Sequence, residues 1–172
     1  MAKLNREIEI ERKYIIMKPS VDMLITMPDY TVSDIEQTYL ASDGNVTHRV
    51  RARMTGGITT YYETKKTRID AMSVIEDEGV ITEAEYNELL QGIDPATRTL
   101  KKTRHTFSFG GLTVEIDVYP EWEHTAIMEC ELPSREAVPT FPDFIKILRE
   151  VTGVKGYSNA SMSRRFPPEE SV

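Results

Sequence analysis

The sequence has little of three things: cysteine, long apolar runs and positive charge. Its one cysteine, Cys130, cannot form a disulfide within the chain, which agrees with a reducing compartment. No run approaches the roughly 18 apolar residues that span a bilayer, and residues 1–7 lack the apolar core of a signal peptide. We therefore expect a cytoplasmic protein that does not enter a membrane.

Basic residues are outnumbered by acidic ones, 21 against 28, which gives a net charge of -7. Because phosphate backbones require a basic surface, this balance argues against a general nucleic-acid binder, although it leaves room for a local basic pocket. The 172 residues suit one folded domain, and no linker or repeat divides them. We expect a single domain over residues 1–165 and a flexible tail over residues 166–172.

The most informative stretch lies near the N-terminus, over residues 7–16. In an extended strand it places Glu7, Glu9, Glu11 and Lys13 on one face, because side chains alternate between faces. Neighbouring carboxylates on that face are about 6.6 Å apart and repel by about 2.5 kcal/mol at an effective dielectric near 20. The stretch therefore predicts a strand whose acidic face meets positive charge.

Further along the chain, alternation and turn residues predict mainly strands. The expected strands are residues 34–41, 46–54, 58–66, 73–79, 97–109, 112–119 and 126–132. Helices are expected at residues 19–27, at 82–92 behind a capping box, and at 139–151, where apolar residues recur at helical spacing. Residues 156–165 are expected to be irregular.

Charged residues at alternate positions recur in almost every expected strand, with apolar or small residues between them. The acidic pairs are Glu9/Glu11, Glu76/Glu78, Glu115/Asp117 and Glu129/Glu131, and the basic sets are Arg49/Arg51/Arg53 and Lys102/Arg104. One interpretation is that these are the solvent faces of half-buried strands. The other is that they point into a closed barrel with a polar lumen, which the segregation of signs between strands favours.

A polar lumen of this kind needs a ligand, since desolvated charges without partners cost several kcal/mol each. Arginine and lysine rows can hold successive phosphate groups. Carboxylate pairs opposite them can hold Mg²⁺ or Mn²⁺, which prefer oxygen ligands and bridge to phosphates. The pattern therefore predicts a site for a metal–polyphosphate complex.

The motifs together resemble the CYTH domain of the triphosphate tunnel metalloenzyme superfamily, over nearly the whole chain. The N-terminal ExExK signature is Glu9-Ile10-Glu11-Arg12-Lys13. The other matching motifs are Gln37-Thr38-Tyr39-Leu40, Arg49-Val50-Arg51, Glu63-Thr64-Lys65, Glu76-Asp77-Glu78, Lys102-Thr103-Arg104, Glu115-Ile116-Asp117-Val118-Tyr119, Glu129-Cys130-Glu131 and Tyr157-Ser158-Asn159-Ala160. Their order and spacing carry the resemblance.

The resemblance implies an α+β fold, mostly β: an eight-stranded antiparallel barrel forming a tunnel, with flanking helices. It implies hydrolysis of a small-molecule triphosphate with Mg²⁺ or Mn²⁺. The implied metal ligands are Glu9, Glu11, Glu131, Glu129 and Asp117. The implied phosphate-binding residues are Arg49, Arg51, Lys65, Lys102 and Arg104. Lys13 and Tyr39 would position the attacking water, and Glu76, Glu78 and Glu115 would support the network.

One position departs from the family pattern. Val74 stands where an arginine is common, and Arg68 or Arg53 could replace that charge. Inorganic tripolyphosphate is the favoured substrate because the chain adds no nucleotide-recognition domain. Adenylate cyclase, thiamine triphosphatase and a non-catalytic polyphosphate- or nucleotide-phosphate-binding module stay open, as do the monomer and the homodimer.

Overall fold

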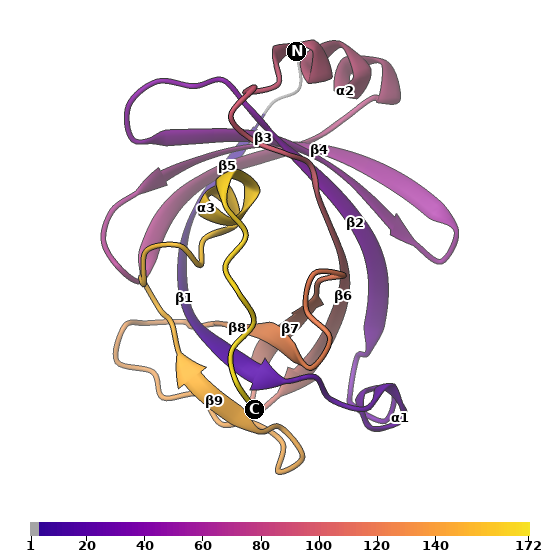
Figure 1. The fold of residues 1–172 in the computed structure, drawn as a ribbon, viewed down its shortest axis with the longest axis vertical. Coiled ribbons are helices and arrows are strands. Elements are labelled where there is room, and N and C mark those ends of the chain that lie inside the picture. The colour runs from indigo at the N-terminus through magenta and orange to yellow at the C-terminus, as the bar shows by residue number, and fades with distance from the viewer. Residues whose placement is uncertain (1–3) are drawn as a thin grey trace.

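The fold is a closed barrel, seen in a computed structural model that describes residues 4–172. The first three residues of the predicted domain lie outside the described residues. The barrel strands are β1 (Asn5–Met17), β2 (Thr31–Leu40), β3 (Val46–Thr55), β4 (Ile58–Arg68), β5 (Ser73–Ile81), β6 (Leu100–Phe109), β7 (Leu112–Val118) and β8 (Thr125–Glu131). Their order is β5-β4-β3-β2-β6-β7-β8-β1, and pairing of β5 with β1 closes the ring (Figure 1). The predicted eight-stranded antiparallel barrel is confirmed.

Alternation decides which side chains enter the barrel. On β1, Tyr14 and Ile16 pack outward against apolar residues of β6, β7 and β8, whereas Glu9, Glu11 and Lys13 line an internal cavity. Because a shift of one residue would move every side chain to the opposite face, the outward apolar row fixes the direction of the acidic one.

Short helices cover the outside of the barrel. Helix α1 (Val21–Leu24) inserts Leu24 into the cluster around β1 and β8. Helix α2 (Glu83–Leu89) continues into the 3-10 helix η1 (Leu90–Gly92) and places Tyr86 over β3 and β4. Thr82 and Glu85 form the predicted capping box at its start. No helix in residues 4–172 is long and apolar enough to cross a membrane.

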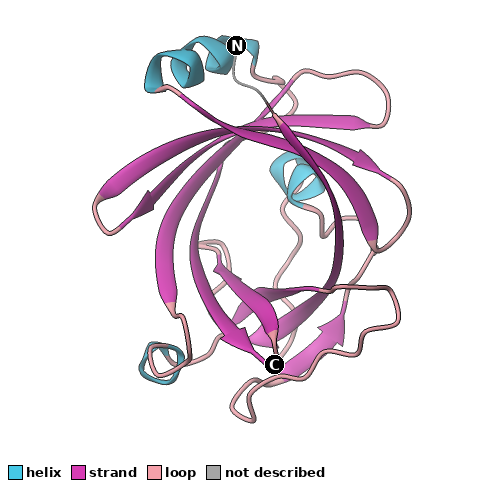
Figure 2. Ribbon diagram, turned by 180° about the vertical axis from the view of Figure 1, so that it is seen from behind, coloured by secondary structure: helices cyan, strands magenta, loops and turns pink. Residues whose placement is uncertain are grey.

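The helix predicted over residues 139–151 is wrong. The chain runs irregularly there until β9 (Ile147–Glu150), which pairs with β1 outside the barrel (Figure 2). Phe141, Phe144 and Ile145 are packed against the main apolar cluster, but from a loop. β5 pairs only with the first half of β1, so the second half offers an open edge, and pairing with β9 satisfies its backbone groups.

Helix α3 (Asn159–Arg164) forms in the segment expected to be irregular, with Ser158 as its N-cap. Its Met162 packs with Ile15, Leu100 and Ile127, which continue the inward-facing rows of β1, β6 and β8. This apolar plug closes one end of the lumen, and α3 lies within the outline of the ring in Figures 1 and 2.

Residues 166–172, expected to be a flexible tail, form no helix or strand but contact the barrel. Phe166 packs edge-on against Tyr119 and Trp122, and the Trp122 indole donates to the Pro167 carbonyl oxygen at 3.0 Å. The Glu169 carboxylate accepts backbone hydrogen bonds from residues 123–125. These contacts tie the tail to the start of β8.

Candidate functional site

The lumen is a cavity of about 300 Å³ lined by seven acidic and seven basic side chains. The acidic ones come from four consecutive strands of the ring, β7, β8, β1 and β5. We call them the acidic wall: Glu9, Glu11, Glu76, Glu78, Glu115, Glu129 and Glu131. The basic wall lies on the other arc, formed by β4, β3 and β6: Arg49, Arg51, Arg53, Lys66, Arg68 and Arg104. Lys13 is the one base within the acidic arc.

The basic wall holds arginines whose charge the protein does not fully satisfy. Arg49 and Arg51 are each 7% exposed, and their Nε atoms have no hydrogen-bond partner among residues 4–172. Arg51 donates from its NH2 group to Gln37 Oε1 at 3.1 Å, but this acceptor is neutral. Burial, together with the neighbouring Arg49 and Arg104, lowers the pKa of Arg51 to about 10. The buried positive charge of this wall therefore favours binding of an anion.

The acidic wall has an excess of negative charge. Glu11 lies directly opposite Glu131 in the β1–β8 pairing. The Glu129 carboxylate, followed by burial, raises the pKa of Glu11 to about 8. Burial, followed by the charges of Glu115 and Glu9, raises the pKa of Glu131 to about 7. The crowded carboxylates of this wall therefore favour binding of a cation.

A divalent cation fits the donor set on this wall. The available ligands are carboxylate oxygens, which Mg²⁺ and Mn²⁺ prefer. Within the described chain, no three or more Asp, Glu, His or Cys side chains are arranged so that they alone could hold a metal ion. A cation on this wall would therefore need oxygens of water or substrate to complete its coordination, as Mg²⁺ commonly does.

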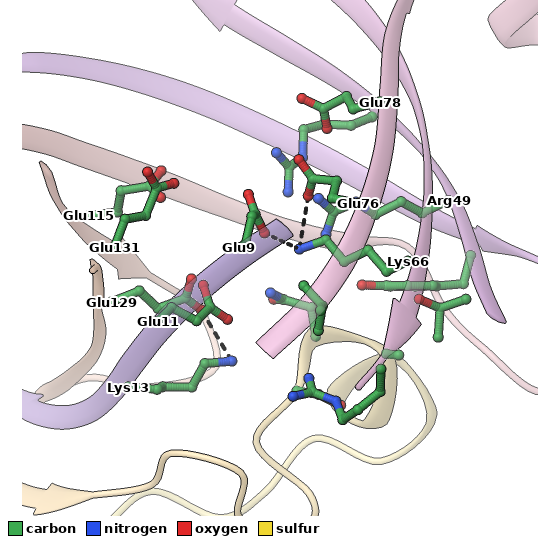
Figure 3. A pocket seen from close by; sticks show the side chains of 18 of the residues that line it. Glu9, Glu11, Lys13, Arg49, Lys66, Glu76, Glu78, Glu115, Glu129 and Glu131 are labelled. Atoms are coloured by element: carbon green, nitrogen blue, oxygen red, sulfur yellow. Dashed lines mark hydrogen bonds and ion pairs between the residues drawn. The ribbon is translucent and has the colours of Figure 1, made fainter. Parts of the chain in front are cut away.

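Two lysines neutralise part of the acidic wall (Figure 3). Lys66 Nζ lies 3.4 Å from Glu9 Oε2 and 3.1 Å from Glu76 Oε2, so it bridges the first strand and β5. Lys13 Nζ lies 3.1 Å from Glu129 Oε1 and donates to the Tyr157 carbonyl oxygen at the same distance. Glu11 and Glu131 have no such ion pair among residues 4–172, which leaves them as the strongest metal-ligand candidates.

Three predicted site residues do not line the lumen. Lys65 is exposed on the outer face of β4, and its neighbour Lys66 takes the inward position. Lys102 and Asp117 are buried beneath the cavity and form an ion pair of 2.8 Å. The prediction of Lys65 as a phosphate contact is therefore one residue out of register.

Asp117 is occupied by two cations rather than available to a metal. Arg104 donates to both of its carboxylate oxygens, at 2.7 and 2.8 Å, and Lys102 adds a third contact. Although burial opposes ionisation, these cations hold the pKa of Asp117 far below its usual range. Arg104 also reaches Glu115 Oε2 at 2.6 Å. The geometry makes Asp117 a positioning residue for Arg104.

The remaining predicted site residues line the lumen. Tyr39 lines the cavity, and its hydroxyl accepts a hydrogen bond from Gln37 Nε2 at 3.3 Å. Glu78 accepts from the Thr64 hydroxyl at 2.7 Å. Val74 faces the lumen directly opposite Arg68 of β4, so a cation is present beside the position where the family pattern has arginine.

Sequence reasoning did not assign several lumen residues a role. They are Asn45, Thr47 and Lys66, whereas Asn159 belongs to the matching motif Tyr157-Ser158-Asn159-Ala160. Asn159 Oδ1 accepts hydrogen bonds from the Tyr119 hydroxyl at 2.6 Å and from Lys102 Nζ at 3.4 Å, which ties α3 to the base of the basic wall. Strand alternation indicates that one of the consecutive Lys65 and Lys66 faces inward but does not decide which, whereas Asn159 enters the lumen only because the chain returns to plug the barrel.

No protein-family model and no curated protein matches the chain. Among solved structures, the inorganic triphosphatase NE1496 is 23% identical, covers 94% of this chain and 97% of its own length, and has a TM-score of 0.56. PH1819 from Pyrococcus horikoshii OT3 is 20% identical over 74% of this chain and 80% of its own, also with a TM-score of 0.56. HpAC1 from Hippeastrum, a proposed adenylyl cyclase with a dominant triphosphatase activity, is 15% identical over 74% of this chain and 81% of its own, with a TM-score of 0.51. The chain therefore has the barrel fold of these proteins, which is the fold that the resemblance to the CYTH domain implies.

Proposed function

We propose that the protein is a divalent-metal-dependent hydrolase of triphosphates, with inorganic tripolyphosphate as its favoured substrate. The observation that carries the proposal is the division of one lumen into two walls. The acidic wall includes Glu11 and Glu131, which have no ion pair within residues 4–172, and the basic wall includes Arg49 and Arg51, whose buried Nε atoms have no acceptor there. Because the lumen has seven acidic and seven basic side chains, neither a bare anion nor a bare cation satisfies both walls. A metal–triphosphate complex satisfies both.

The choice of substrate rests on what the lumen offers to the rest of a triphosphate. Among its lining residues, within the part of the chain that the structure describes, Tyr39 is the one aromatic side chain, and it is 6% exposed. A nucleobase or a thiamine ring would find no open aromatic surface to stack on. The similarity to a protein named as an inorganic triphosphatase supports the same substrate class.

The cofactor would be Mg²⁺ or Mn²⁺, held by Glu11 and Glu131 with Glu9 and Glu129 beside them. When bound, such an ion polarises phosphate oxygens and lowers the pKa of bound water. Phosphoryl transfer depends mainly on positioning and electrostatic stabilisation, which the basic wall would supply.

The side chains of this protein would share the remaining work. Arg49, Arg51 and Arg104 would bind the phosphate oxygens and neutralise their charge in the transition state. Lys13, held between Glu129 and the Tyr157 carbonyl, would keep a donor beside the attacking water. Since the Tyr39 hydroxyl accepts from Gln37, its own proton is free to be donated to water or to a phosphate oxygen.

Phosphate release from tripolyphosphate, ATP and thiamine triphosphate in Mg²⁺ tests the proposal directly. We expect turnover to be highest with tripolyphosphate. Release from none of the three would reject the hydrolase. Preferred turnover of ATP or thiamine triphosphate would reject the substrate assignment while leaving the hydrolase standing.

A non-catalytic phosphate-binding module is the second candidate, because the basic wall alone could hold a polyphosphate. The double substitution Glu9→Gln with Glu11→Gln separates the two. The hydrolase requires that turnover in Mg²⁺ is lost, whereas unaltered affinity and turnover would show that the metal assignment is wrong.

A further inference from the structure

A second cavity of about 230 Å³ lies beside the lumen. Its outer boundary is formed by Ala71 and the segment 151–155, which connects β9 to α3. It shares Glu11, Lys13, Arg68 and Ser158 with the lumen, so the two cavities meet at the proposed metal end of the site. Since a water molecule occupies about 30 Å³ in the liquid, this side pocket has room for one phosphate group with several waters.

The charges of the side pocket favour an anion. Its charged lining residues are three cations, Lys13, Arg68 and Lys155, and one acid, Glu11, whereas the lumen has equal numbers of each. If a divalent cation binds Glu11, that remaining acid is neutralised as well. The pocket is therefore the more electropositive of the two cavities.

Two of these cations are held at the boundary between the cavities. The Lys13 ammonium contacts Glu129 on the lumen side and the Tyr157 carbonyl on the other, both at 3.1 Å. One nitrogen of Arg68, NH1, donates to the carbonyl oxygens of Asp70 and Ala71 at 3.0 and 3.4 Å, which fixes the guanidinium in place. Its other N–H groups have no protein acceptor within residues 4–172 and are left for a ligand.

Lys155 supplies the third cation from the rim. It is exposed, forms no ion pair or side-chain hydrogen bond within the described chain, and does not line the lumen. It is thus the one cation of the side pocket that can be changed without touching the lumen.

We propose that the side pocket is a binding site for a single phosphate group, which receives the orthophosphate released by hydrolysis. The proposal rests on the proposed function for the source of that phosphate, but the binding itself requires no catalysis. The same chemistry would also accept the end of a phosphate chain longer than three units, and the experiment below separates these two sources.

Direct binding is measured by titrating inorganic phosphate into the ¹⁵N-labelled protein and following backbone amides by NMR. We expect saturable shifts at Val154 and Lys155, separate from those at Arg49 and Arg51 in the lumen. Lys155→Gln should weaken the side-pocket affinity by about 5-fold, as expected for loss of one partly screened charge contact of about 1 kcal/mol. Lys146→Gln is the matched control, because Lys146 is also exposed, lines neither cavity and changes the net charge equally.

Shifts confined to the lumen, or equal side-pocket affinities in the two variants, would overturn the proposal. If wild-type protein binds phosphate at Val154 and Lys155 but hydrolyses nothing, the proposed function fails while the site stands. If the protein hydrolyses tripolyphosphate but shows no shifts at Val154 and Lys155, the phosphate site is rejected while the proposed function stands.

Two kinetic measurements identify the source of the phosphate: product inhibition by orthophosphate and the KM for tetrapolyphosphate. If the pocket receives the product, Lys155→Gln should raise the inhibition constant of orthophosphate against tripolyphosphate hydrolysis by the same factor. If it holds the end of a longer chain, the substitution should instead raise the KM for tetrapolyphosphate and leave orthophosphate inhibition unaltered, which would overturn the product assignment.

Discussion

The acidic and basic walls of the lumen are built in the same way, from alternate residues of neighbouring strands, but the protein compensates their charges differently. The acidic wall has two counterions: Lys13, within its own arc, contacts Glu129, and Lys66, which reaches across from the basic wall, contacts Glu9 and Glu76. Within residues 4–172, Arg104 and Lys66 of the basic wall have carboxylate partners, while Arg49 and Arg51 have buried Nε atoms with no acceptor.

This difference shows what each wall is prepared to receive. Glu11 and Glu131 retain the uncompensated negative charge at one place, which suits a small cation of high charge. Arg49 and Arg51 present a row of donors, which suits an extended anion. Removing charge from one wall should therefore affect catalysis and binding differently from removing it from the other.

The largest effect is expected from Glu11→Gln. Because an amide cannot replace a carboxylate as a hard anionic ligand, turnover of tripolyphosphate in Mg²⁺ should fall by about 100-fold or more. Glu7→Gln on the same strand is the matched control, since Glu7 is exposed and is not among the residues that line the lumen. Equal turnover of the two variants would remove Glu11 from the metal site.

The next effect tests whether Asp117 serves the basic wall or the metal. Asp117→Asn leaves Arg104 and Lys102 buried without their shared carboxylate, so the free energy of unfolding should fall by about 3–5 kcal/mol. Chemical denaturation measures this loss, and Asp143→Asn on the surface should change stability by less than about 0.5 kcal/mol. Weaker Mg²⁺ binding with unaltered stability would instead make Asp117 a ligand.

Much of this architecture could be predicted because alternation is a property of the strand itself. The rows Glu9-Glu11-Lys13 and Arg49-Arg51-Arg53 are separated by apolar or small residues that must face a core, so their direction follows from the sequence. The capping box at Thr82 and Glu85 is equally local.

What the sequence could not show depends on distant contacts. Phe141, Phe144 and Ile145 have helical spacing, but the open edge of β1 and the packing of this segment against the barrel override that propensity. The plug helix α3 packs in a cluster with residues far away in the sequence, such as Ile15 and Leu100. Consecutive lysines at 65 and 66 leave the register undecided until the pairing of β4 is known.

A smaller effect on turnover is expected from Lys66, which the pairing of β4 turns toward the lumen. Lys66→Gln removes the cation that bridges Glu9 and Glu76, and kcat/KM for tripolyphosphate should fall by about 10-fold, as for loss of a charge pair of about 1.4 kcal/mol. Lys65→Gln changes the same charge one residue away on the outer face and should leave kcat/KM within about 2-fold. If Lys65→Gln had the larger effect, the inward direction of Lys66 would be wrong.

The smallest effect concerns the stability of the metal-free protein. In the folded state the pKa of Glu11 is raised from its ordinary 4.5 to about 8 and that of Glu131 to about 7, by neighbouring carboxylates and burial. A raised pKa means that the folded state holds these protons more tightly than the unfolded state, so their contribution to stability is complete below pH 4.5 and is lost as the pH rises through 8.

The melting temperature in EDTA should therefore fall between pH 5 and pH 8, and Glu11→Gln should make this fall less steep. Mg²⁺ should oppose it, because a bound cation replaces the protons. A melting temperature that does not change over this range in EDTA would mean that the acidic wall carries no excess charge for a metal to neutralise.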